Sequence, residues 1–409
     1  MKLNDYPGTS GLRFDGRLAA FDKLVSLFLS APDRAKSSGK KVVAKGMLSP
    51  SDIIYASGAM AYDICTHETI VQSVLYGRSV LSQRAIEAGM SPDLSPWVLT
   101  MLGASLNGKS EVALDAYSTA CGDGFDDQIT KSFQVMAQAH SLPLRFWEVP
   151  RYDPETEHWA LSYLKSELEQ FFEWMAKQFG QVVTESSLQH AIHLGNLLRQ
   201  DMVDLCAFLA GSVVPIPALE YYLVQMMMGD YAQDPEELHA LYSELLHELS
   251  ERVNRNKEER TISDTPKRVY ILGDEMQELS VLNAIEDNGG VLVGSDFRLA
   301  LYYELVDEKL PPLDSLARWI WHMPNNLPTI ERIRFELPFI ERQKPDAIIL
   351  SSVVGSRTSS ETEKMVKDLL LKALRLPVLC IETALPHETT DKAEYQIQAF
   401  LDIIRGEPR

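Results

Sequence analysis

Short apolar segments alternate with amphipathic helical segments in the last third of the chain, and this alternation limits the possible folds more than any other feature. The predicted strands are 269–273, 291–293, 346–350 and 377–381, and the predicted helices are 276–285, 359–374 and 392–404. Strands joined through helices run parallel with right-handed crossovers, so their sheet is buried on both faces. The sequence therefore predicts a doubly wound α/β domain at this end.

The same alternation occurs between residues 40 and 149. Strands are expected at 40–46, 112–117 and 144–149, and helices at 52–56, 67–88 and 126–140. From about residue 164 to 253 the apolar residues keep a continuous helical spacing, and the charged run 254–260 is typical of an exposed linker. We therefore expect an α/β protein with two doubly wound parallel-sheet domains and a helical insert.

The expected boundaries follow from these shifts in periodicity. They are 1–39 for an N-terminal helical arm, 40–183 for the first α/β domain, 184–262 for the helical insert and linker, and 263–409 for the second α/β domain.

Charge and hydropathy argue against two classes of partner. The chain has 39 Lys and Arg against 58 Asp and Glu, a formal net charge of −19, which repels nucleic acid and anionic lipid surfaces. No stretch reaches the roughly 18 uninterrupted apolar residues of a membrane span, and the N-terminus lacks the pattern of a secretory signal. We expect a cytoplasmic protein that contacts neither nucleic acid nor membrane.

The four cysteines do not form a motif of their own. Cys65, Cys121, Cys206 and Cys380 are far apart and include no CxxC pair, so neither a disulfide framework nor a zinc ribbon is indicated. Ligands of open parallel sheets bind beyond the carboxyl ends of the strands. Cys121 is expected at such a position, directly after a strand, although composition alone favours a structural role for it. No GxGxxG motif or P-loop accompanies it.

Several segments resemble the 2-hydroxyacyl-CoA dehydratase and benzoyl-CoA reductase family. The matching segments are 46–59, 94–97, Ala120–Cys121, 376–382 and 395–401, while 294–304 with 318–326 is most similar to the larger dehydratase subunit. The resemblance implies an oxygen-sensitive heterodimer of anaerobic metabolism, with a 4Fe-4S cluster held by three cysteines between two flavodoxin-like domains of each subunit. It also implies an acyl-CoA or aromatic CoA thioester as substrate. An ATP-dependent activator protein would supply an electron for ketyl radical chemistry.

The chain departs from the family pattern at the cluster ligands. The three ligand positions correspond to Ser95, Cys121 and Ser356, so these are the candidate cofactor-binding residues and Cys121 is the one candidate metal ligand. Serine hydroxyls are hard donors with a high pKa and are poor ligands for iron–sulfur clusters. The Thr-Arg pair that the family carries before its last helix is replaced by Tyr395-Gln396. The cluster is then either lost from this chain or held together with a partner subunit.

Three hypotheses follow. In the first, the chain is a subunit of a CoA-thioester dehydratase, which is a lyase, or of a dearomatising reductase, with Cys121 as a remaining ligand. In the second, it is a cluster-free structural partner of a homologous cysteine-bearing subunit. In the third, it is a two-domain α/β protein that binds a small molecule. The resemblance implies that Ser95, Cys121 and Ser356 converge in the cleft between the domains, and the catalytic residues remain unassigned.

Overall fold

The computed structural model describes most of the chain. The described residues are 9–46, 49–71, 78–106, 112–122, 127–259, 266–273, 278–356, 362–383 and 386–406. None of the described helices is long and apolar enough to cross a membrane.

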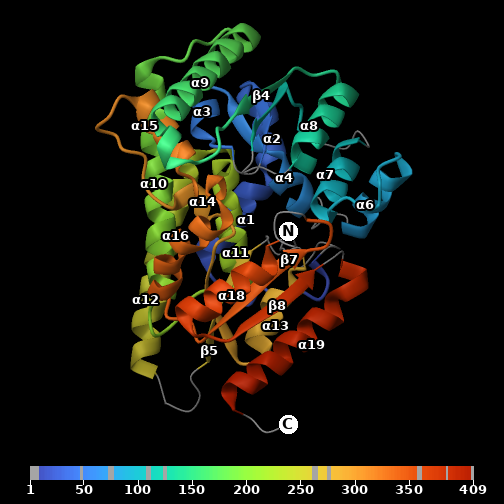
Figure 1. The fold of residues 1–409 in the computed structure, drawn as a ribbon, viewed down its shortest axis with the longest axis vertical. Helices are drawn as coiled ribbons and strands as arrows, with labels where there is room; N and C mark the ends of the chain where they lie inside the picture. The colour runs from blue at the N-terminus through green and yellow to red at the C-terminus, as the bar shows by residue number, and fades with distance from the viewer. Residues whose placement is uncertain are drawn as a thin grey trace.

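Two parallel sheets of four strands organise the molecule (Figure 1). The first has the order β2-β1-β3-β4 and consists of β1 (Val42–Lys45), β2 (Met60–Asp63), β3 (Ala116–Cys121) and β4 (Leu144–Glu148). The second has the order β6-β5-β7-β8 and consists of β5 (Lys267–Gly273), β6 (Gly290–Ser295), β7 (Ala347–Val353) and β8 (Val378–Thr383). The predicted fold class is confirmed. In both sheets the order reverses beside the first strand, as in flavodoxin-like folds.

Helices surround each sheet and, apart from α19 after the last strand, connect its strands. Around the first sheet they are α3 (Asp52–Tyr55), α4 (Ile64–Thr66), α6 (Arg78–Glu87), α7 (Pro96–Leu106) and α8 (Asp127–His140). Around the second sheet they are α13 (Ser280–Asp287), α14 (Leu299–Tyr302), α15 (Pro312–Trp321), α16 (Thr329–Arg342), α18 (Glu363–Leu374) and α19 (Pro386–Arg405).

Long helices lie between the two sheets in sequence. They are α9 (Glu157–Phe179), α10 (Glu185–Leu209), α11 (Ala218–Met226) and α12 (Pro235–Glu259). In Figure 1, β4, α7 and α8 lie in the upper part, β5, β7 and β8 in the lower part, and α10 and α12 run along one side past both. Helix α10 contacts α3 of the first sheet's unit and β6 of the second. The helical segment therefore connects the two sheets.

The N-terminal arm holds α1 (Ala19–Leu29) and α2 (Ala31–Ser38). The free amides at the start of α1 are satisfied from α12, because the Glu248 carboxylate accepts bonds of 3.0 Å from both Ala19 N–H and Ala20 N–H. Phe21 and Leu24, on the apolar side of α1, are buried.

The hydrophobic core explains why the strands are apolar on both faces. Val43 of β1 and Ile271 of β5 belong to one continuous core that the central helices share. Their neighbours in sequence point the other way, so Ala44 and Leu272 lie in two separate cores on the opposite faces of the sheets. Each sheet is therefore buried on both sides.

The structure differs from the sequence in the position of β3. The predicted strand 112–117 instead covers Ala116–Cys121, so Cys121 ends the strand and does not follow it. The apolar pattern did not indicate this part of the strand, because Ser118 and Thr119 are polar. They are buried because β3 lies between β1 and β4.

One further prediction was wrong, and another can be followed only in part. The helix predicted over 67–88 is described as a π-helical turn (His67–Val71) and as α6 (Arg78–Glu87), and 72–77 lie outside the described residues. The run 254–260 was predicted as a linker, but α12 continues through it as far as Glu259. Lys, Arg and Glu are good helix formers, so a charged run does not end a helix by itself.

Candidate functional site

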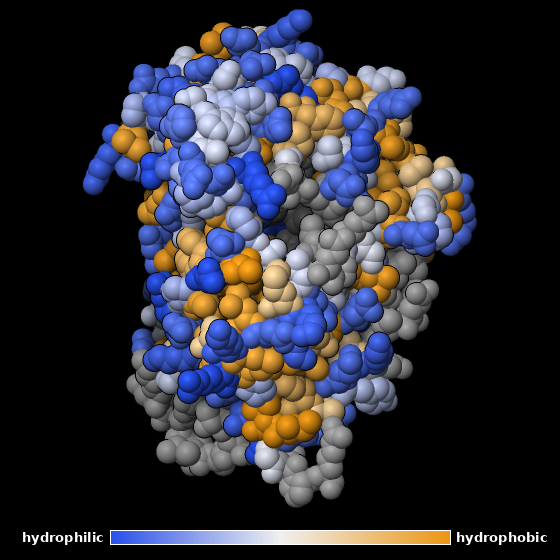
Figure 2. Space-filling model, in the orientation of Figure 1, coloured by the Kyte–Doolittle hydropathy of each residue, from blue (hydrophilic) through white to orange (hydrophobic). Residues whose placement is uncertain are grey.

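The carboxyl ends of the two sheets face each other. Arg298, shortly after β6, places Nη1 3.4 Å from Oδ2 of Asp63, the last residue of β2. Gln128 in α8 donates a hydrogen bond of 3.0 Å to the carbonyl oxygen of Gly355, shortly after β7. On the face in Figure 2 a hollow opens between the upper and lower halves of the molecule. Strand ends of this kind form ligand sites in parallel α/β proteins, so we treat this crevice as the candidate site.

The segments that carry Ser95 and Ser356 touch in this crevice. Ser95 directly precedes α7, and its N–H donates to Oε1 of Gln128 at 3.0 Å. Gly355 has a φ of +79°, and a β-carbon at this position would lie 3.3 Å from Ser95 N. Ser95 and Ser356 are both buried. The structure therefore brings the two predicted serine positions close together.

Cys121 faces a different set of groups. Its Sγ lies 3.6 Å from the carbonyl oxygen of Trp147, on the neighbouring strand β4. Burial raises the pKa of the Cys121 thiol, and the nearby carboxylates of Glu148 and Glu167 raise it further. The neutral thiol is therefore favoured over the thiolate that binds metals.

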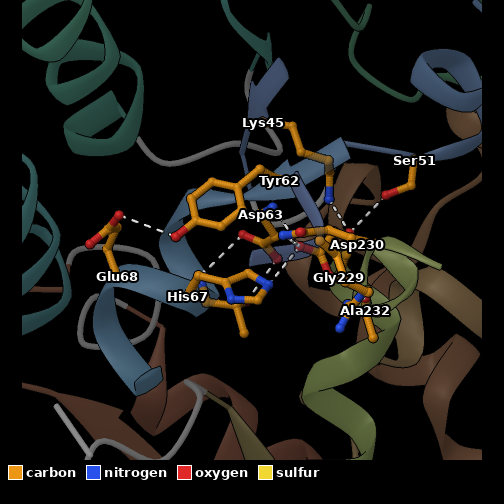
Figure 3. Close-up of polar contacts among 12 residues, drawn as sticks. Lys45, Ser51, Tyr62, Asp63, His67, Glu68, Gly229, Asp230 and Ala232 are labelled. Atoms are coloured by element: carbon orange, nitrogen blue, oxygen red, sulfur yellow. Dashed lines mark hydrogen bonds and ion pairs between the residues drawn. The ribbon is translucent and has the colours of Figure 1, made fainter. Parts of the chain in front are cut away.

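A buried ionic network occupies the adjoining part of the crevice, and sequence reasoning missed it (Figure 3). Lys45 and Ser51 both donate to the carbonyl oxygen of Gly229, which follows α11. The carboxylate of Asp230 accepts the backbone N–H of Asp63 at 3.0 Å and lies 2.8 Å from Nε2 of His67. These side chains are essentially inaccessible to solvent.

The charges in this network compensate one another. Burial lowers the pKa of Lys45, and the neighbouring Asp63 and Asp230 oppose this effect. Burial would raise the pKa of Asp230, but His67, the Asp63 N–H and Lys45 together hold it below its ordinary value. The His67 ring is stacked between Phe28 at 4.3 Å and Tyr62 at 4.6 Å, measured between ring centroids.

The backbone next to Asp230 is strained. Tyr231, Ala232 and Gln233 have φ values of 58°, 46° and 63°, in the left-handed region that side chains other than glycine seldom adopt. Each such residue costs on the order of 1–3 kcal/mol and persists where its surroundings hold it. Here the carbonyl oxygen of Ala232 accepts a bond from Arg34 of the N-terminal arm. No residue pattern in the sequence indicated this turn.

A second buried ion pair joins α3 to α10. Nη2 and Nη1 of Arg199 donate to the two carboxylate oxygens of Asp52 at 2.7 and 3.1 Å. Tyr231 donates its hydroxyl to the same carboxylate at 2.9 Å, and the guanidinium lies 4.5 Å from the ring centroid of Trp319. This cluster connects the first sheet's unit, the helical segment and the second sheet's unit.

The fold and the crevice define a class of protein with two flavodoxin-like parallel sheets whose strand ends face each other. The family profile of the 2-hydroxyglutaryl-CoA dehydratase D-component matches residues 47–404, and the chain belongs to this family. No curated protein sequence matches the chain at a significant level. The match starts at residue 47. Strand β1, which ends at Lys45, therefore precedes the matched region.

The residues at the candidate ligand positions do not fit an iron–sulfur cluster held by three cysteines of this chain. Two of the three positions, Ser95 and Ser356, carry hydroxyls, and the thiol of Cys121 is biased toward its protonated form. Across the described residues, no three His, Cys, Asp or Glu side chains gather closely enough to hold a metal ion.

Proposed function

We propose that the chain is a cluster-free subunit of a 2-hydroxyacyl-CoA dehydratase or benzoyl-CoA reductase type of complex. In this complex a homologous cysteine-bearing subunit holds the 4Fe-4S cluster and receives the electron from an ATP-dependent activator. The substrate class is an acyl-CoA or aromatic CoA thioester. Membership of the dehydratase family supports the substrate class.

One observation carries the assignment of this chain to the cluster-free role. Of the donors at Ser95, Cys121 and Ser356, one is a sulfur atom, and burial together with acidic neighbours raises the pKa of its thiol. A chain without its own ligand set keeps a role in such an enzyme by assembling with a subunit that has one. Permanent interfaces of this kind are usually large and apolar.

Iron analysis of the complex tests the proposal. The chain is co-expressed with a homologous cysteine-bearing subunit and purified without oxygen, and iron and acid-labile sulfide are measured in the complex and in the isolated chain. We expect less than about one iron atom per isolated chain and a brown complex whose iron is accounted for by the other subunit.

A matched pair of variants tests the role of Cys121. Cys121→Ala removes a half-buried thiol at the end of β3. Cys380→Ala removes a half-buried thiol within β8 and is the matched control. We expect both variants to keep the iron content of the complex. Loss of iron from Cys121→Ala alone would show that this chain contributes a ligand and would overturn the cluster-free assignment.

The partner is tested separately by light scattering on native material. We expect the chain to elute with a homologous subunit. A stable monomer that purifies without any homologue would contradict the proposed assembly, whatever its iron content.

A further inference from the structure

The two sides of the crevice are held together by very different contacts. On one side Arg298 reaches from the second sheet's unit to Asp63 and Thr66 of the first, with Nη2 2.6 Å from Oγ1 of Thr66. Arg298 and Asp63 are fully buried. Separating them would leave buried charges without compensation, which is among the most costly changes in a protein interior.

The shared core reinforces this side. Val43 of the first sheet and Ile349 of the second lie in the same continuous core. Any separation there would expose apolar surface as well as charge.

The other side is held by fewer contacts, and one of them is made by the neutral side chain of Gln128. Gln128 lies in the first turn of α8, which covers the face of the first sheet that points away from the shared core. Its amide accepts from Ser95 N–H within the first sheet's unit and donates to the Gly355 carbonyl oxygen of the second. Gly355 is exposed. Helices α6 and α19 also contact each other between the two units.

We propose that Gln128 is a latch between the two units. The crevice opens when the bond to Gly355 breaks and α6 separates from α19, and the units pivot about the buried pair of Arg298 and Asp63. The two hydrogen bonds of the amide make Gln128 suited to this role. Its oxygen accepts from Ser95 N–H in the first unit, and its nitrogen donates to Gly355 in the second. The inference is independent of the proposed function, since it concerns access to the crevice and not its chemistry.

Hydrogen–deuterium exchange of the full chain, read by mass spectrometry with residue-level fragmentation, tests the latch. Gln128→Ala removes both hydrogen bonds. We expect exchange of the Ser95 amide and of residues 353–356 to rise about tenfold, equivalent to about 1.4 kcal/mol. Exchange of the Asp63 amide, which is bonded to Asp230, should stay unchanged because the pivot remains intact.

A second variant separates the two hydrogen bonds. In Gln128→Glu the carboxylate still accepts from Ser95 N–H but repels the Gly355 carbonyl oxygen. We therefore expect Ser95 to stay protected while residues 353–356 exchange faster. Gln200→Ala is the control, because Gln200 is an exposed helical glutamine that bonds to Asp204 in its own helix, at 2.8 Å.

Two results would overturn the proposal. One is unchanged exchange at 353–356 in both Gln128 variants, which would show that the amide does not hold the second unit. The other is an equal rise at Asp63, which would indicate general destabilisation and not opening on one side.

Discussion

Removal of the Asp52 carboxylate should destabilise the contact between α3 and α10 severely. Asp52 and Arg199 are each exposed by 1% or less, and the guanidinium donates to both carboxylate oxygens. Burial opposes the charge on Arg199, but Asp52 outweighs this effect and holds its pKa above the ordinary value. An arginine guanidinium keeps its charge even where burial lowers its pKa, so in Asp52→Ala Arg199 stays charged, with the Trp319 ring as a remaining neighbour.

The expected cost follows from that uncompensated charge. Breaking a buried ion pair by removing one partner costs about 3–5 kcal/mol. For a cooperative unit of about 150–250 residues this corresponds to a fall in Tm of roughly 6 to 20 °C. Asp204→Ala, which removes an exposed carboxylate from α10, should change stability by no more than about 0.5 kcal/mol.

A double variant makes the prediction refutable. Scanning calorimetry and urea unfolding are applied to Asp52→Leu, Arg199→Met and the double change. Since apolar residues of similar volume replace a buried pair at little cost, the double variant should be more stable than the sum of the single changes by about 2 kcal/mol or more. A residual loss of about 1–3 kcal/mol is expected, because the Tyr231 hydroxyl loses its acceptor. Additivity within about 0.5 kcal/mol would show that the pair does not act as a unit.

Two further predictions concern the second sheet's unit. Burial raises the pKa of Glu336 from 4.5 to about 8, so the folded state binds this proton more tightly than the unfolded state. Stability should fall by about 3–5 kcal/mol as the pH rises from 4.5 to 8, and urea unfolding of Glu336→Gln should lack this loss; an equal pH dependence in the variant would refute the assignment. Gly273 has a φ of +119°, and an added β-carbon would lie 2.2 Å from the Ser351 carbonyl oxygen. Gly273→Ala should therefore cost about 2–4 kcal/mol, against about 1 kcal/mol for Gly39→Ala, where φ is +65° and no atom lies within 4 Å; equal costs would contradict the role of the close contact.

The period of the apolar residues determined the fold class. Strands such as Ala347–Val353 are buried along their whole length, and a continuous apolar run between amphipathic helices has few other solutions than a parallel sheet covered on both faces. The same reasoning failed for β2 and for the end of β3. Asp63 is buried against Arg298, 235 positions away, and Ser118 is buried because β3 lies between β1 and β4, and an apolar count cannot reveal such neighbours.

The sequence and its family resemblance named Ser95, Cys121 and Ser356, but their surroundings were decided by the tertiary structure alone. Local sequence fixes periodicity and turn chemistry, because these depend on neighbours within a few residues. The bond of Gln128 to Gly355 spans 227 positions, and the contact of Arg298 with Asp63 spans 235. Such contacts need both sheets and the central helices in place, and the buried charges of Arg298 and Asp63 are tolerated because each compensates the other.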